Sequence, residues 1–213
     1  TLDSFLADVT AILRDEVDEL VRLGATYIQL DAPHYPLLLD EQTRAFYESH
    51  GWTLERWLSA GIELDNAVVA GFASQGVTFG MHLCRGNQES RWLVSGDYAG
   101  IARHIFGTVD VQRLLLEYDD DRSGAFESLR HVPDDRTVVL GLVTTKSGRL
   151  ESPGDLIARI REAGRFFPLE QLALSPQCGF ASSVVGNRLS ADEQRAKLRL
   201  VTKTAAAVWG SPE

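Results

Sequence analysis

Apolar and polar residues alternate along this chain in two distinct periods, one typical of helices and one typical of strands. Apolar residues recur at helical spacing in five segments, which predicts helices over residues 2–23, 54–75, 98–106, 153–166 and 191–208. Short runs rich in β-branched and large apolar residues predict strands at Ala25–Asp31, Val77–Cys84, Val111–Tyr118, Thr137–Thr145 and Leu172–Cys178. A further short helix is expected around Phe126–Arg130, and residues 32–51 are expected to form a polar loop.

Capping residues support several of these helix boundaries. Asp3 or Ser4 is the expected cap of the first helix, and Gly24 its stop. Pro153 follows Ser152 at the start of the fourth helix, a common helix opening. Ser190 with Glu193 three residues later forms a capping-box pattern before the last helix.

The strands are short and nearly continuously apolar, and each is separated from the next by a helical segment. This alternation predicts an α/β fold with a parallel sheet covered by helices. No linker, low-complexity tract or shift in composition divides the chain. We therefore expect residues 1–213 to form a single domain.

Composition narrows the class of protein. The chain has 213 residues, 44% of them hydrophobic, and a net charge of -9. An acidic chain without a basic cluster is a poor nucleic-acid binder, because phosphate contacts dominate that affinity. No apolar stretch approaches the length of a membrane helix, and two cysteines cannot supply a disulfide framework. We expect a cytoplasmic enzyme with small ligands and no nucleic-acid or membrane partner.

Each predicted strand ends in residues that carry chemistry. They are Gln29 and Asp31, His82 and Cys84, Glu117, Thr144 with Thr145 and Lys146, and Gln177 with Cys178. A (β/α)8 barrel collects active-site residues from the carboxyl ends of many strands. A Rossmann-type sheet concentrates them at one switch point and uses a glycine-rich loop, which no strand here is followed by. The pattern favours a TIM barrel.

Four of these residues form a plausible zinc set. His82 and Cys84 are two apart on one strand and face the same side. Glu117 ends the next predicted strand and Cys178 ends the last, so in a barrel all four converge over the mouth. Two thiolates, one imidazole and one carboxylate are donors that suit zinc.

Each residue also has a structural interpretation. A lone cysteine is usually a small buried hydrophobe, and a histidine at a strand end is often a hydrogen-bonded structural residue or a general base. Glu117 opens the acidic run that includes Asp119–Asp121, typical of a solvated loop. Asp31 is equally suited to cap a helix or to pair with an arginine at the barrel rim. Spacing alone leaves these alternatives open.

Five stretches resemble the C-terminal catalytic domain of cobalamin-independent methionine synthases, and more closely the shorter bacterial proteins of that superfamily and the related epoxyalkane:coenzyme M transferases. They are YIQLD (Tyr27–Asp31), HLCRGN (His82–Asn87), LLEYDD (Leu115–Asp120), VVLGLVTTK (Val138–Lys146) and LSPQCGF (Leu174–Phe180). They occur in the family order across nearly the whole chain.

The resemblance implies that His82, Cys84, Glu117 and Cys178 bind Zn2+. It implies a methyltransferase in which a homocysteine-like thiol is held as a zinc-bound thiolate and methylated, with a folate or a corrinoid as methyl donor. Asp31 matches the family carboxylate that contacts the homocysteine amino group.

The sequence departs from methionine synthases at two places. Asp31-Ala32-Pro33 replaces their Asp-Glu-Pro run, and Thr144 and Lys146 stand where they have an Asp-x-His whose histidine is the proposed proton donor. Asp31 and Lys146 are thus our catalytic candidates, and Asp31, Arg85 and Gln177 our substrate-binding candidates. Arg85 and Lys146 suit either an anionic substrate group or a salt bridge to Asp119–Asp121.

Two other functions remain open: an epoxide–thiol transferase of the coenzyme M type, and a barrel that binds zinc or a thiol without turnover.

The length of the chain leads to one further expectation about the fold. Five βα units fall short of the eight in a barrel, which usually takes about 250 residues. We therefore expect the last five units of a barrel, closed by an N-terminal segment or a partner chain.

Overall fold

The computed structural model describes residues 1–181 and 183–210. Its centre is a sheet of five parallel strands in the order β1-β2-β3-β4-β5. The strands are β1 (Tyr27–Asp31), β2 (Thr78–Leu83), β3 (Arg113–Glu117), β4 (Thr137–Val143) and β5 (Leu172–Pro176). Each lies within the range that the sequence predicts, shortened by one or more residues.

Every strand pairs with the next one along the chain. A Rossmann-type sheet reverses its strand order at a switch point, whereas consecutive units of a barrel keep the order seen here. The predicted α/β class with a parallel sheet is confirmed. Because all strands run the same way, their carboxyl ends, and the loops that follow them, lie along one edge of the sheet.

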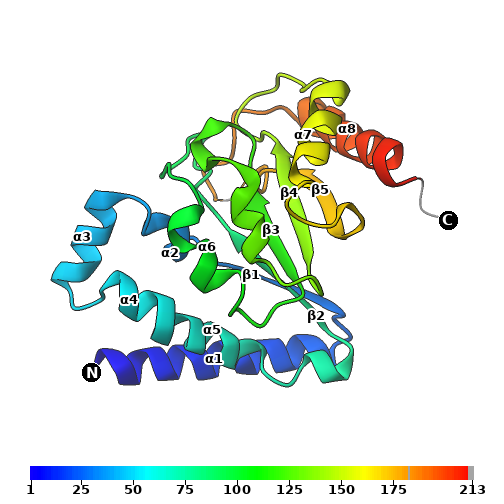
Figure 1. Cartoon of the computed structure of the whole chain (residues 1–213). Helices are drawn as coiled ribbons and strands as arrows, with labels where there is room; N and C mark the ends of the chain where they lie inside the picture. Colours follow the sequence, from blue (N-terminus) through cyan, green and yellow to red (C-terminus); the bar gives the residue numbers. More distant parts are fainter. Residues whose placement is uncertain (182, 211–213) are drawn as a thin grey trace.

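Helices connect and cover the strands (Figure 1). The longer ones are α1 (Leu2–Arg22), α3 (Glu41–Ser49), α5 (Ile62–Val69), α6 (Ala99–Ile105), α7 (Pro153–Ala163) and α8 (Ala191–Trp209). The short ones are α2 (His34–Leu37), α4 (Leu54–Arg56), the π-helical η1 (Trp57–Gly61) and the 3-10 turns η2 (Ala73–Gln75), η3 (Asp121–Ser123), η4 (Phe126–His131) and η5 (Leu169–Gln171). No helix in the described ranges is long and apolar enough to cross a membrane.

Three details of the predicted helices are wrong. The expected polar loop at 32–51 contains α2 and α3, and the N-cap of α3 is Asp40, whose carboxylate accepts the Thr43 N–H at 2.8 Å. The expected helix 54–75 ends at Val69, because Gly71 takes a left-handed backbone conformation with φ of 86°. The cap of α1 is Thr1, which forms a capping box with Ser4.

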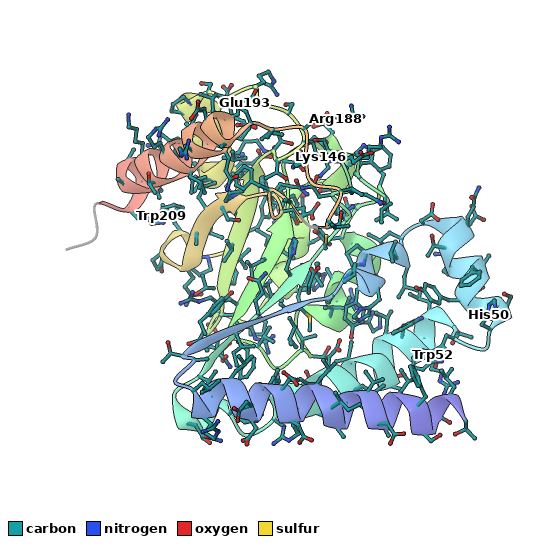
Figure 2. All side chains as sticks on the ribbon, turned by 180° about the vertical axis from the view of Figure 1, so that it is seen from behind. His50, Trp52, Lys146, Arg188, Glu193 and Trp209 are labelled. Atoms are coloured by element: carbon teal, nitrogen blue, oxygen red, sulfur yellow. The ribbon has the colours of Figure 1, made fainter. Side chains whose placement is uncertain are left out.

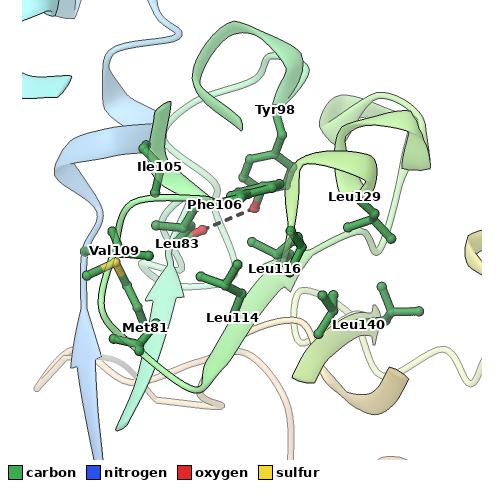
Figure 3. Close-up of a cluster of buried hydrophobic side chains, with 14 of the residues drawn as sticks. Met81, Leu83, Tyr98, Ile105, Phe106, Val109, Leu114, Leu116, Leu129 and Leu140 are labelled. Atoms are coloured by element: carbon green, nitrogen blue, oxygen red, sulfur yellow. Dashed lines mark hydrogen bonds between the residues drawn. The ribbon is translucent and has the colours of Figure 1, made fainter. Parts of the chain in front are cut away.

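The two faces of the sheet differ. On the face covered by helices, Leu114 and Leu116 of β3 are buried against Phe106 and other apolar side chains (Figure 3). Successive residues of a strand point to opposite faces, so Leu115 and Glu117 lie on the other, inner face. That inner face carries the candidate site residues.

Candidate metal centre

The four candidate ligands lie along the carboxyl edge of the sheet. His82 is the penultimate residue of β2, and Cys84 follows directly after this strand. Glu117 is the last residue of β3, and Cys178 stands two residues beyond β5. The parallel arrangement of the strands therefore brings together residues up to 96 positions apart, counted from His82 to Cys178 (178 − 82).

The donor atoms of these residues form one compact group. One ligand atom from each of His82, Cys84, Glu117 and Cys178 lies within 4.8 Å of all the others. The two sulfur atoms are 3.8 Å apart, well beyond the S–S bond length of about 2.05 Å. Nε2 of His82 lies 3.3 Å from Oε1 of Glu117. One ion at the centre of this group can contact all four side chains.

Asp31 orients the imidazole of His82. Its Oδ1 lies 3.0 Å from Nδ1 of His82, and the two residues are register neighbours in the β1–β2 pair. An Nδ1–H held by a carboxylate leaves Nε2 as the metal-facing nitrogen, the usual arrangement of a ligating histidine. The Asp31 side chain is 59% exposed, so it is also within reach of a substrate.

Glu117 is held from two sides. Its carboxylate accepts the backbone N–H of Arg85 at 3.0 Å, and its own backbone N–H donates to the hydroxyl of Tyr98 at 3.1 Å. The side chain is fully buried, and Oε2 has no hydrogen-bond partner among the described residues. A buried carboxylate oxygen without a donor is costly unless a cation contacts it.

The electrostatics of the group also suit a cation. Burial lowers the pKa of His82, but the carboxylates of Asp31 and Glu117 outweigh it and the pKa rises to about 10. Hydrogen bonding to Cys178, then burial and the charge of Glu117, raise the pKa of the Cys84 thiol. These donors repel added negative charge and attract positive charge. Nitrogen, sulfur and carboxylate donors in this number are a typical zinc set, so the residues present fit Zn2+.

A pocket of about 110 Å³ lies beside the donor group on the inner face. His82 and Cys178 line it together with three polar side chains, Gln29, Ser175 and Gln177. It is large enough for the reacting end of a small molecule, and it opens directly onto two of the candidate ligands.

A hydrogen-bonded chain fixes the orientation of Gln177. Asn87 donates to the hydroxyl of Thr145 at 3.0 Å, and this hydroxyl donates to Oε1 of Gln177 at 2.8 Å. All three residues are buried. Because Oε1 is occupied, the amide Nε2 of Gln177 remains as a donor, and it has no acceptor among the described residues.

Gly141 allows β4 and β5 to approach closely at this edge. A β-carbon there would lie 2.9 Å from Cα of Gln177 and 3.0 Å from the carbonyl oxygen of Leu116. The β4–β5 register shifts between Gly141 and Val143, and the N–H of Gln177 then bonds the carbonyl of Val143 at 2.8 Å. This register shift determines the direction in which the chain leaves β5, and so the position of Cys178.

Arg85 does not lie among the residues that line the pocket. Its side chain is 1% exposed, and its guanidinium packs 4.1 Å from the centre of the Tyr98 ring. Arg85 forms no ion pair within the described ranges, so the expected alternative, a salt bridge to Asp119–Asp121, is not formed either. Arg122 pairs with Asp119 and Asp120 instead. The predicted substrate contact of Arg85 gains no support from this geometry.

Lys146 follows β4 by three residues, so it lies at the same end of the sheet as the donor group. Figure 2 shows it at the end of the molecule away from α1. Its Nζ is buried and has no hydrogen-bond partner among the described residues. Burial raises the pKa of Asp119, and a hydrogen bond from Thr144 and the nearby charge of Lys146 partly offset this rise. The side chain of Asp119 is 2% exposed, so this part of the acidic run is not a solvated loop.

The sequence does not single out two supporting residues, Asn87 and Tyr98. Asn87 donates to Thr145, which orients Gln177, and Tyr98 supports Glu117. Thr145 is noted as a strand-end residue, but its role is not predicted, and the only signal for Asn87 is its place in the HLCRGN stretch. Tyr98 lies outside every motif, and its role depends on how α6 packs against β3.

Comparison with known proteins places the chain among methionine synthase relatives. The family model "Cobalamin-independent synthase, Catalytic domain" matches residues 1–207. The Uncharacterized protein YxjG of Bacillus subtilis is 41% identical over 206 residues, which is 96% of this chain and 54% of that protein. The Methionine synthase of Pyrococcus abyssi is 25% identical over 177 residues, covering 83% of this chain and 43% of that protein.

The fold is shared with a solved structure. A protein of Listeria monocytogenes, described as a candidate vitamin-B12 independent methionine synthase, superposes with a TM-score of 0.76 at 27% identity. The match covers 99% of this chain and 57% of that one. The chain thus spans about half the length of the relatives that it matches.

Proposed function

The chain belongs to the cobalamin-independent methionine synthase catalytic-domain family, and on that premise we propose that it is the metal-binding part of a zinc-dependent transferase that methylates a substrate thiol. The observation that carries the proposal is the donor group, in which His82, Cys84, Glu117 and Cys178 offer ligand atoms within 4.8 Å of one another. A substrate thiol fits such a site, because the thiolate is both a zinc ligand and the nucleophile for methyl transfer.

The four side chains would hold zinc, which when bound supplies the Lewis acidity that keeps a thiol deprotonated at neutral pH. Asp31 orients His82 through the 3.0 Å contact to Nδ1. Glu117 is the ligand best suited to make room for a substrate sulfur, because it is a carboxylate among softer donors.

The pocket beside Cys178 would receive the rest of the thiol substrate. Gln177 would donate its free amide hydrogen to a substrate acceptor, and Asp31 would accept from a substrate amino group. Lys146 is proposed as the proton-transfer group in place of the family histidine. Its Nζ has no hydrogen-bond partner among the residues that the structure describes.

The barrel and the binding site for the methyl donor would be completed by residues outside this chain. The relatives that this chain matches are about twice as long, so an N-terminal barrel segment, or a partner chain, would complete the site and contribute to donor binding.

The experiment is a metal and transfer assay on the full-length protein. We expect about one zinc per chain, loss of methyl transfer to homocysteine on chelation, and recovery on adding zinc. Cys178→Ser should lower both zinc content and transfer, whereas Asp192→Asn, on the exposed surface of α8, should leave both unchanged. Full transfer by a metal-free protein would refute the proposal. Alkylation of a thiol by an epoxide, but never by a methyl donor, would replace it with an epoxide–thiol transferase.

A further inference from the structure

Arg85 is a buried cation without a buried anion of its own. Its side chain is 1% exposed and lies over the ring of Tyr98. Nη1 contacts the carbonyl oxygen of Arg122 at 3.5 Å, the outer limit of a hydrogen bond, while Nε and Nη2 have no partner among the described residues. A guanidinium in such a place is expensive unless a negative charge nearby compensates for it.

A buried carboxylate of the proposed metal centre contacts the backbone of Arg85. The backbone N–H of Arg85 donates to Oε1 of Glu117 at 3.0 Å. The Tyr98 ring beneath the guanidinium carries the hydroxyl that accepts the N–H of Glu117 at 3.1 Å and donates to the carbonyl of Leu83 at 3.3 Å (Figure 3). Arg85 and Tyr98 thus support Glu117 at both its carboxylate and its backbone.

The proposed metal centre would carry a net negative charge, which a nearby positive charge would stabilise. Two thiolates and one carboxylate around a divalent cation leave one net negative charge, and a substrate thiolate adds another. That charge would be enclosed, since Glu117 is fully buried and His82 is 8% exposed. The guanidinium of Arg85 packs on the ring of Tyr98, whose hydroxyl contacts the Glu117 backbone, and so places a positive charge in the same buried region.

We propose that Arg85 is a positioning residue of the metal centre, whose buried positive charge offsets the anionic ligand set and whose backbone N–H holds the Glu117 carboxylate. This inference rests on the proposed zinc site. It replaces the expectation that Arg85 contacts the substrate.

The test compares Arg85→Met and Arg85→Lys with the unaltered full-length protein. The readouts are the Kd of zinc, from competition with a chelator, and the Kd of two thiols of the zinc-loaded protein, one with a carboxylate and one without. We expect Arg85→Met to weaken zinc binding about 10- to 100-fold, the usual effect of losing a group that supports a metal ligand. Both thiols should weaken equally, and Arg85→Lys, which keeps the charge, should recover most of the zinc affinity.

Arg136 provides the matched control. It is a partly buried arginine that donates to the carbonyl of Phe106 at 3.1 Å, beside the amino end of β4, at the opposite edge of the sheet from the site. Arg136→Met should leave the zinc Kd unchanged. If Arg85→Met does not fold, Tyr98→Phe serves instead. It keeps the ring under the guanidinium but removes the hydroxyl that accepts the Glu117 N–H and donates to the Leu83 carbonyl, and it should weaken zinc binding by a smaller factor.

The outcomes separate this inference from the proposed function. A folded Arg85→Met variant that binds zinc as tightly as the unaltered protein overturns the inference alone. Selective weakening of the carboxylate-bearing thiol also overturns it, in favour of a substrate contact. An unaltered protein that binds no zinc overturns the proposed function first.

Discussion

Oδ1 of Asp31 lies 3.0 Å from Nδ1 of His82, so a carboxylate at the end of β1 orients an imidazole near the end of β2. Carboxylates in this position fix the tautomer of a ligating histidine and raise its basicity. Asp31 therefore orients a candidate metal ligand, in addition to its proposed role of binding a substrate amino group.

We therefore expect Asp31→Asn to weaken zinc binding about 10-fold or more, since an amide supports the imidazole less well than a carboxylate. The measurement is the zinc Kd by chelator competition, with Asp192→Asn as the surface control. An unchanged zinc Kd, together with weaker binding of amino thiols only, would assign Asp31 to the substrate alone.

Gly141→Ala tests the close approach of β4 and β5. The new methyl group would lie 2.9 Å from Cα of Gln177 and 3.0 Å from the Leu116 carbonyl oxygen, so backbone must move. We expect the free energy of unfolding to fall by about 1–3 kcal/mol, as for other overpacked positions, and zinc binding to weaken because Cys178 shifts. Gly154→Ala is the control, since the nearest atom there is 3.5 Å away. If Gly141→Ala has the same zinc affinity and stability as the unaltered protein, the close approach of β4 and β5 is not required at this position.

Thr145→Val tests the chain from Asn87 to Gln177. Valine matches the shape of threonine but neither accepts from Asn87 nor donates to Gln177, so two buried amides lose a partner. We expect a loss of about 1–3 kcal/mol in the free energy of unfolding and a higher KM for the thiol. Thr145→Ser keeps the hydroxyl and should retain both properties. A higher KM in Thr145→Ser as well would point to packing rather than to hydrogen bonding.

Lys197→Met tests how α8 supports the loop that follows β4. The ammonium of Lys197 is fully buried, 3.2 Å from Glu151 and 2.7 Å from the Arg149 carbonyl, and Glu151 accepts the N–H of Thr144 at 2.9 Å. Leaving Glu151 without this partner should cost about 3–5 kcal/mol in urea unfolding. Adding Glu151→Gln to Lys197→Met should recover part of the loss. A single variant within about 1 kcal/mol of the parent would contradict this reading.

The sequence predicts the strands well and the local helices less well, for physical reasons. The strands of this sheet are apolar runs bounded by polar residues, so their pattern survives without tertiary information. Helix α3 has no buried residue and depends on the cap at Asp40, which gives no apolar stripe to detect. The end of α5 depends on the backbone conformation of Gly71, which residue type permits but does not dictate.

In the candidate site, too, some features follow from the sequence pattern and others depend on tertiary packing. The four donor residues stand out as a plausible zinc set because they lie at the ends of apolar parallel strands, which share one edge of the sheet. Spacing alone leaves other roles open, and the resemblance of the motifs is what favours metal binding. The role of Arg85 could not be predicted, because an arginine suits a substrate contact, a salt bridge or a buried counter-charge equally well. Only the packing of its guanidinium on Tyr98 distinguishes among these.

X-ray absorption at the zinc edge, recorded with and without homocysteine, reports whether the four donors hold a metal that a substrate thiol can reach. We expect one zinc per chain with two sulfur ligands from Cys84 and Cys178, joined by nitrogen and oxygen donors from His82 and Glu117. Homocysteine should add a third sulfur. Zinc without sulfur ligands, or a sulfur count that homocysteine leaves unchanged, would contradict this expectation.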